Sequence, residues 1–390
     1  MQIPLQEIIM SAYKLINYLK KEPMLLLSVI AAAAGLIMTP PTAELLRGID
    51  WRTLGILLMM LCVLEGFKQE NVLQPLVALA GKLKSMTSLS LFLVFCVFFS
   101  SMFVTNDVSL LIFVPLTILL FRQAGREKFI LPVITLENIA AVRGSLLTPF
   151  GSPQNLFLYG QAEIGAGRFM LHMLPLCLLS GVLLIGFVFF VFRRNLHDPV
   201  SLSSEETFMK KKSFLYRMYI GLFVIVLLVI VTRTSLWPAA LAFVLLTITF
   251  ADRRLLGKVD YVLLATFLCF FVFSSSVARN PSVGGFLEKA VAGHEYWWAI
   301  GLSQLISNVP ATIVLYPFSR NFAGLIYGAD TAGLCSLIGS LASVINYRIY
   351  VREYPGNGKA FIRTFTLISW AFFLLVVIPG LLLSRWDFFS

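Results

Sequence analysis

SSMFVTNDVSLLIFVPLT (residues 100–117) and GLSQLISNVPATIVLYPFS (residues 301–319) are two apolar stretches with the same internal layout. Polar residues interrupt each one, Thr105-Asn106-Asp107 in the first and Ser307-Asn308 in the second, and a proline follows nine residues after each asparagine. Polar groups at membrane depth are costly, so a segment that keeps them usually lines a cavity or a pathway. Two such breaks, one in each half of the chain, indicate a transporter built from internal repeats.

The composition is that of a polytopic, all-α membrane protein. The chain is 58% hydrophobic and only 13% charged, with a mean hydropathy of +0.86, whereas a soluble domain is nearer a quarter charged. The net charge of +11 does not indicate nucleic acid, because the basic residues lie in short loops rather than along one face. The five cysteines occur singly, and no His/Glu zinc pattern or Ser/His pairing is present, so we expect neither a metal centre nor an enzyme.

Apolar segments predict seven ordinary membrane spans, at residues 23–39, 51–67, 170–192, 216–232, 235–250, 259–277 and 364–384. Four further stretches are interrupted: 86–121 and 295–320 by the polar breaks, and 129–162 and 331–347 by glycine-rich segments. A break at mid-length allows two interpretations, a broken helix that crosses the bilayer or a re-entrant hairpin that returns to its starting side.

Loop charges favour hairpins at 86–121 and 295–320 and crossing helices at 129–162 and 331–347. This arrangement puts the N-terminus in the cytoplasm, the C-terminus outside, and more than two thirds of the 31 basic residues on the cytoplasmic side. The two hairpins then open to opposite sides, which is the inverted arrangement of alternating access. We therefore predict an interfacial helix at 1–22, a first inverted repeat at 23–192, a cytoplasmic linker at 193–215, an extra span at 216–232 and a second repeat at 235–384.

Each hairpin is followed by a second interruption that frees backbone groups. The first is GSLLTPFGSPQN (residues 144–155), where two prolines and two glycines prevent a regular helix, and the second is the weaker GSLAS (residues 339–343). Unwound carbonyl groups suit Na⁺, while the N-termini of half-helices suit an anion.

In their order and spacing, these four motifs resemble the ion transporter superfamily of arsenite permeases and divalent anion:sodium symporters. The strongest likeness is to the YbiR-like bacterial inner-membrane permeases, and it covers residues 24–384. The resemblance implies two hairpin tips that meet two discontinuous helices near the midplane, an inner-membrane location and a homodimer. It implies no cofactor apart from Na⁺ as one candidate coupling ion. In the sodium-coupled dicarboxylate carriers each tip reads Ser-Asn-Thr, whereas Asp107 and Val309 stand at the third positions here.

By this resemblance, the substrate and ion site draws on both tips and both broken helices. The candidate residues are Thr105, Asn106, Asp107, Ser145, Thr148, Gly151, Ser152, Asn155, Ser307, Asn308, Thr312, Gly339, Ser340 and Ser343. A carboxylate at a tip is suited to bind Na⁺ or a proton, and Asp107 is also placed to cap the helix that follows it.

Arg143 lies directly before the first glycine-rich break, at membrane depth. An arginine there costs about 2.5–3.5 kcal/mol, so it needs a partner. Two interpretations stay open: Arg143 supplies positive charge to an anionic substrate, or it forms a structural pair with Glu137 or with another carboxylate, such as Glu65.

The sequence thus predicts a secondary carrier for a small inorganic or organic anion, driven by Na⁺ or H⁺. Alternatives are a Na⁺/H⁺ antiporter of the same fold, in which Asp107 is central, and a passive anion channel.

Overall fold

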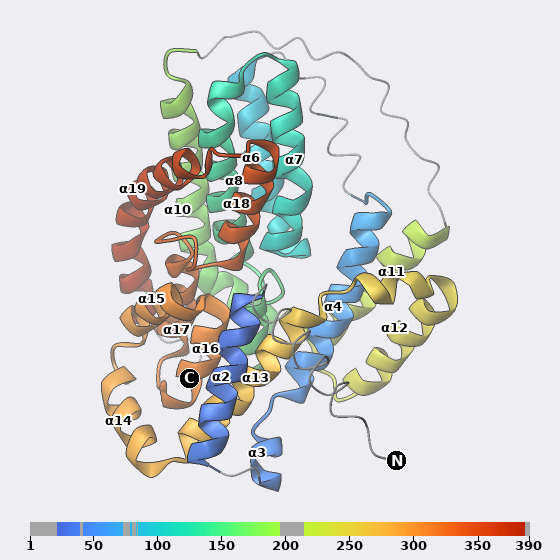
Figure 1. Ribbon diagram of the computed structural model, residues 1–390, viewed down its shortest axis with the longest axis vertical. Coiled ribbons are helices and arrows are strands. Elements are labelled where there is room, and N and C mark those ends of the chain that lie inside the picture. The colour runs from blue at the N-terminus through green and yellow to red at the C-terminus, as the bar shows by residue number, and fades with distance from the viewer. Residues whose placement is uncertain are drawn as a thin grey trace, which may run out of the picture.

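The computed structural model describes residues 22–39, 42–72, 79, 83, 85–195 and 214–386, and within them the chain is helical without a β-strand (Figure 1). The α-helices are α2 (Pro23–Met38), α3 (Ala43–Arg47), α4 (Trp51–Gln69), α6 (Met86–Val104), α7 (Asn106–Gln123), α8 (Ile130–Ser145), α9 (Pro153–Gln161), α10 (Ala166–Phe192), α11 (Phe214–Thr232), α12 (Trp237–Ala251), α13 (Tyr261–Arg279), α14 (Pro281–Val291), α15 (Glu295–Ile306), α16 (Asn308–Leu315), α17 (Phe322–Ala332), α18 (Leu341–Glu353) and α19 (Gly358–Ser384). Short 3₁₀ turns occupy Glu127–Phe129 (η1), Arg253–Lys258 (η2) and Tyr316–Phe318 (η3).

All seven predicted ordinary spans are helices, and their bounds differ from the predicted ones by a few residues. In the described part of the chain, six helices are long and apolar enough to cross a membrane, and α2 and α12 are shorter apolar helices. A polytopic membrane protein is therefore confirmed at the level of its helices. The predicted interfacial helix at 1–22 lies outside the described residues apart from Glu22, as does most of the linker predicted at 193–215.

The second span of each half begins in the same way, at Ile49-Asp50-Trp51 and Val259-Asp260-Tyr261. Asp50 caps α4 with φ −78° and ψ 80° and accepts a bond from the Thr53 amide, while Asp260 caps α13 with φ −76° and ψ 81° and accepts from the Leu263 amide. An aspartate at this position satisfies amides that the first helical turn leaves without partners. The matching geometry is local evidence of an internal repeat.

Glycines allow the long helices to pack closely. Gly35 of α2 lies against Phe273 and Ser276 of α13, so an added Cβ would approach Ser276 Cβ to 3.0 Å. Gly55 of α4 faces the Trp237 ring of α12 in the same way, at 2.5 Å. Small residues at such crossings favour helix association in a membrane. In a repeat, the first two spans of one half, α2 and α4, correspond to the first two spans of the other, α12 and α13. The packing of α2 on α13 then has α12 on α4 as its counterpart.

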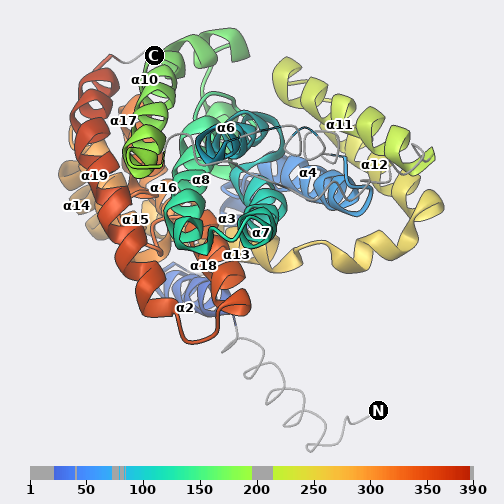
Figure 2. The same ribbon diagram turned by 90° about the horizontal axis from the view of Figure 1, so that it is seen from above.

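Both polar breaks separate two helices that pack on one another, α6 on α7 and α15 on α16. The α6–α7 pair lies in the upper half of Figure 1, and the α15–α16 pair lies in the lower half. Seen from above, α11 and α12 stand on the opposite side of the molecule from α19 (Figure 2). With 12 and 8 residues, α15 and α16 are only about 18 and 12 Å long at 1.5 Å per residue, too short to cross a bilayer of about 30 Å alone.

The first pair is longer, since α6 and α7 have 19 and 18 residues. Each would measure about 27–29 Å, so length alone does not separate a deep hairpin from two complete spans. A deep hairpin and a pair of complete spans both return the chain to its starting side. The predicted side of every other loop is therefore the same in the two cases.

Ion pairs between helices join only segments that the charge pattern assigns to the same side. Among the described residues these pairs are Arg122–Glu353 on the predicted cytoplasmic side, and Arg279–Glu44 and Arg320–Glu288 on the predicted outer side. Exposed pairs of this kind contribute little to stability, but they agree with the predicted topology. The orientation of the termini and the inversion of the repeats stay predictions.

Candidate functional site

The two breaks have the same backbone conformation. Thr105 has φ 70° and ψ 157°, and Ser307 has φ 69° and ψ 159°. This region of backbone space is essentially restricted to glycine, so each tip holds a strained residue that costs about 1–3 kcal/mol. Neither Thr105 nor Ser307 makes a side-chain cap bond to the helix that follows it. Such strain at matching positions is typical of functional sites rather than of ordinary turns.

The asparagines at the two tips accept the same hydrogen bond, from the backbone amide of the residue that follows them. Asn106 Oδ1 accepts a bond from the Asp107 amide at 2.9 Å, and Asn308 Oδ1 accepts from the Val309 amide at 3.0 Å. Asn106 and Asn308 are buried, with exposed fractions of 5% and 2%. Their correspondence, predicted from the nine-residue spacing to proline, is confirmed in the local geometry. Thr312 is also buried, and its hydroxyl donates to the Asn308 carbonyl at 2.8 Å.

Asp107 is half-buried in the first turn of α7, and it is Asn106 rather than Asp107 that bonds an orphan amide. Asp107 Oδ1 is buried without a hydrogen-bond partner among the described residues. Its carboxylate interacts electrostatically with Asp260, at the start of α13. A negative charge near a helix N-terminus is favoured by the helix dipole, but a second carboxylate nearby opposes it. A cation or a proton that binds Asp107 relieves this repulsion.

The first broken helix ends at Ser145 and restarts at Pro153. Asn155 Nδ2 donates to the carbonyl groups of Ser145, Leu146 and Thr148, at 3.1, 3.3 and 3.1 Å. Ser152 caps α9 by accepting from the Asn155 amide. The loop is therefore held by its own side chains, with its carbonyl groups gathered on one amide.

The second broken helix stops after Ala332 and restarts at Leu341, so its break covers residues 333–340. The sequence placed this break at Gly339–Ser343, and Ser343 instead lies in the first turn of α18. The break lies earlier because Gly333 and Gly339 bracket it, and nothing after Leu341 interrupts a helix. Ser340 and Ser343 are buried, and Ser343 Oγ accepts a bond from Asn138 of α8 at 3.0 Å.

One glycine in each break lies hard against the preceding half-helix. A Cβ on Gly151 would lie 2.3 Å from the Ser145 carbonyl oxygen, and a Cβ on Gly339 would lie 2.3 Å from that of Ala332. No real side chain tolerates such a distance, so only glycine fits either position. Gly151 and Gly339 are thus equivalent by geometry, 188 residues apart in the chain.

Each hairpin touches the broken helix of its own half three residues before its tip. The Thr148 hydroxyl donates to the Met102 carbonyl, and Gln304 donates to the Ala332 carbonyl at 3.2 Å. The second helix of each hairpin also packs against the broken helix of the other half, α7 on α18 and α16 on α9. The predicted residues are thereby brought together in one buried region at the junction of the halves, with Thr105 and Asp107 half-buried and the rest buried.

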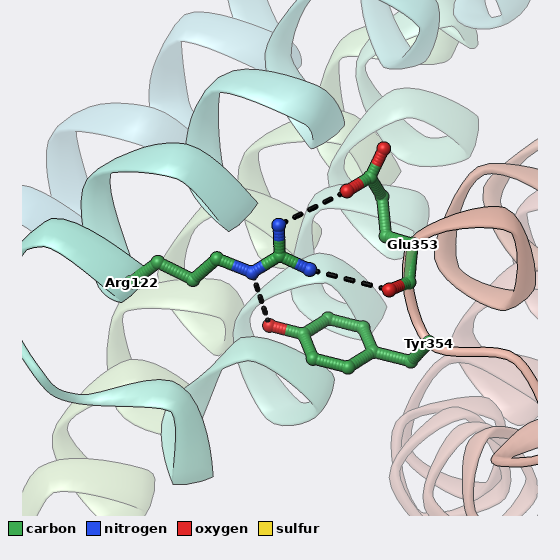
Figure 3. A network of polar contacts seen from close by, with 3 residues as sticks. All are labelled: Arg122, Glu353 and Tyr354. Atoms are coloured by element: carbon green, nitrogen blue, oxygen red, sulfur yellow. Dashed lines mark hydrogen bonds and ion pairs between the residues drawn. The ribbon is translucent and has the colours of Figure 1, made fainter.

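Two sets of polar contacts, here called clamps, join the halves: Arg122 with Glu353 and Tyr354, and Tyr316 with Gln161. At the end of α7, the Arg122 guanidinium donates to Glu353 Oε2 at 3.0 Å, to the Glu353 carbonyl at 3.3 Å and to the Tyr354 hydroxyl at 2.9 Å (Figure 3). Beyond α16, the Tyr316 hydroxyl donates to Gln161 at the end of α9 at 3.3 Å. Each clamp joins a hairpin to the opposite broken helix.

Arg143 is fully buried, and its contacts differ from the predicted pairs. Its Nε donates to Ser180 Oγ at 3.1 Å, while Glu137 accepts from Thr117 and Glu65 pairs with Lys68 at 3.2 Å. Glu137 and Glu65 are therefore not its partners, and the carboxylate that interacts electrostatically with Arg143 is Asp330. The reason is geometric: six residues of regular helix separate Glu137 from Arg143, and α8 is unbroken between them.

Asp330 is a site residue that the sequence interpretation missed. It is fully buried on α17 and accepts a bond from Gln154 Nε2 at 2.9 Å. It also interacts electrostatically with Arg143. The signal was present in GLIYGADTAGL (residues 324–334), where a single carboxylate stands in an apolar stretch, as Asp107 does.

These features, together with the family matches that follow, indicate a membrane transporter. The sequence profile of the citrate transporter family matches residues 8–328. An uncharacterised transporter of Methanocaldococcus jannaschii is 30% identical over 339 residues, which are 86% of this chain and 89% of that protein. The inner membrane protein YbiR of Escherichia coli is 30% identical over 343 residues, with coverage of 85% and 89%. The chain therefore belongs to the citrate transporter family, within the ion transporter superfamily, as its motifs predicted.

Proposed function

We propose that this protein is a secondary active transporter that moves a small anion across the bacterial inner membrane, coupled to Na⁺ or H⁺. The observation that carries the proposal is the pair of tips: two buried asparagines, each after a residue strained near φ 70°, facing two broken helices. A passive pore has no need of two matched, covered half-sites, whereas a carrier needs a site that faces each side in turn.

In this proposal, residues 23–192 and 235–384 form inverted repeats, and α6–α7 and α15–α16 are hairpins that enter from opposite sides. The substrate lies between the tips and the broken-helix loops. The positive ends of α7, α9, α16 and α18 favour an anion, and Arg143 adds a full positive charge. Citrate is the first anion to test, because the family profile describes citrate transporters. A homodimer is the expected assembly.

A Na⁺/H⁺ antiporter is the second candidate, favoured by the electrostatic repulsion between Asp107 and Asp260. In that case cation and proton compete for the carboxylates, and Arg143 has no substrate to bind.

The experiment is uptake into proteoliposomes from a panel of anions, citrate first, with Na⁺ and pH gradients imposed separately and together. The proposal expects that one of the two gradients drives one anion to accumulate transiently above its external concentration. This accumulation should stop when an ionophore dissipates that gradient. Downhill equilibration alone would identify a channel. Exchange of Na⁺ for H⁺ without anion uptake would identify the antiporter.

A further inference from the structure

A second buried polar cluster lies beside the broken helices and contains none of the tip residues. Its members are Arg143 on α8, Gln154 on α9, Ser180 on α10 and Asp330 on α17, all with exposed fractions of 1% or less. Arg143, Gln154 and Ser180 come from the first half of the chain, and Asp330 comes from the second. The cluster therefore carries one positive and one negative charge across the junction of the halves.

The two charges are coupled but do not touch. Arg143 and Asp330 interact electrostatically. They do not form an ion pair, because no guanidinium nitrogen of Arg143 lies within 4.0 Å of a carboxylate oxygen of Asp330. Within the described residues, hydrogen-bond partners are missing for Arg143 Nη1 and Nη2, Asp330 Oδ2 and Gln154 Oε1. Buried polar atoms are usually hydrogen-bonded, so four such atoms in one cluster require an explanation.

The other groups around Arg143 differ from Asp330 in their chemistry. The further titratable groups facing Arg143 are Tyr296 of α15, Tyr327 of α17 and Cys177 of α10. The Tyr327 ring packs on the His172 ring of α10, with centroids 5.3 Å apart. Glu137, on the same helix as Arg143, bonds Thr117 of α7 instead. Asp330 is therefore the one carboxylate among the described residues that faces Arg143.

We propose that Asp330 binds a coupling proton and that Arg143 is the group through which anion binding drives its uptake. With both residues charged, the buried cluster is neutral. When anion oxygens bind Arg143 Nη1 and Nη2, the cluster gains a negative charge that the apolar surroundings disfavour. A proton from the aqueous phase then forms an O–H bond at Asp330 Oδ2 and restores neutrality. Release of the anion reverses the step, and the proton leaves with it.

One proton thus moves with each negative charge held at Arg143. The bound state contains the proton, so a lower pH on the loading side favours it, and an inward proton gradient drives uptake. This inference rests on the proposed function for its anion, but the electrostatic dependence of Asp330 on Arg143 can be tested without transport.

The first test uses infrared spectroscopy of the purified protein at neutral pH. Arg143→Gln removes the counter-charge, so Asp330 is expected to hold its proton more tightly and to show a stronger carboxylic C=O band than in the wild-type protein. The added intensity should vanish in Arg143→Gln/Asp330→Asn and persist in Arg143→Gln/Glu137→Gln, which controls for Glu137, the buried acid on the same helix as Arg143. An Arg143→Gln spectrum without added intensity assignable to Asp330 would overturn the proposal.

The second test uses proteoliposomes and citrate. Asp330→Asn should abolish the stimulation of citrate uptake by an inward pH gradient. The ratio of the uptake rates with and without the gradient should fall to about one. Undiminished stimulation in Asp330→Asn would overturn the proposal. Because Arg143→Gln also removes the proposed anion-binding group, the folded yield of Asp330→Asn in detergent is what separates loss of coupling from loss of folding. Wild-type vesicles that take up no anion of the panel would refute the proposed function, whereas the infrared test would still decide whether Asp330 depends on Arg143.

Discussion

The strain at the two tips gives a stability prediction with a worked magnitude. Thr105 and Ser307 occupy φ near 70° and ψ near 158°, where a residue with a Cβ costs about 1–3 kcal/mol. Replacement by glycine removes this cost and adds about 0.5–1 kcal/mol of backbone entropy in the unfolded chain. Thr105→Gly and Ser307→Gly should therefore each stabilise the protein by about 1 kcal/mol.

The side chains themselves contribute little to this balance. Thr105 makes no side-chain cap bond, and its carbonyl, which accepts from Ser109 at 2.9 Å, is unchanged by the substitution. The Ser307 hydroxyl makes only a weak contact of 3.5 Å to Asn308. Thr105→Ala and Ser307→Ala are matched controls, because they remove the hydroxyl and keep the Cβ that creates the strain.

The assay is the free energy of unfolding in mixed detergent micelles, compared between the glycine and alanine variants at each tip. The reasoning expects the glycine variant to be the more stable of each pair. Glycine variants no more stable than their alanine controls would refute the claim that the tips are strained.

Three further predictions concern the breaks, the clamp and the tip carboxylate. Gly151→Ala places a Cβ 2.3 Å from a carbonyl oxygen, so it should destabilise the fold by about 1–3 kcal/mol in the same unfolding assay, whereas Gly186→Ala, with open space around it on α10, should be neutral within about 1 kcal/mol; equal effects would contradict the close approach. Arg122→Gln breaks an exposed clamp, so it should cost less than about 1 kcal/mol of stability but alter the transport rate, and Glu353→Gln should act in the same direction; rates equal to wild type in both would show that the clamp plays no part in transport. Asp107→Asn should abolish or uncouple ion-driven uptake while leaving the folded yield intact, and unchanged uptake under the same gradient would remove Asp107 from the coupling role.

The sequence predicted most of what depends on local chemistry. Polar residues and glycines in apolar stretches mark positions where a membrane helix cannot continue, so the breaks at Thr105, Ser307 and 146–152 fall where expected. The second break was predicted too late in the chain, because GSLAS combines a glycine with two serines. The observed break begins earlier, at Gly333, which stands among apolar residues.

Contacts between distant residues could not be predicted from spacing. Arg122 and Glu353 lie 231 residues apart, and Gln154 and Asp330 lie 176 apart, so only the folded chain shows that they meet. Arg143 is the clearest example: Glu137 is near it in the sequence, but the opposing charge comes from α17 in the other half. The positive φ of both tips also needed the structure, because threonine and serine rarely adopt it.

The most direct measurement of the account is uphill anion uptake in proteoliposomes containing the wild-type protein, Asn106→Ala or Asn308→Ala. The two asparagines are equivalent in local geometry and lie in opposite halves. If both tips form one substrate and ion site, each substitution alone should abolish accumulation while the protein remains folded. Wild-type accumulation in either folded variant would contradict a shared site between the two tips.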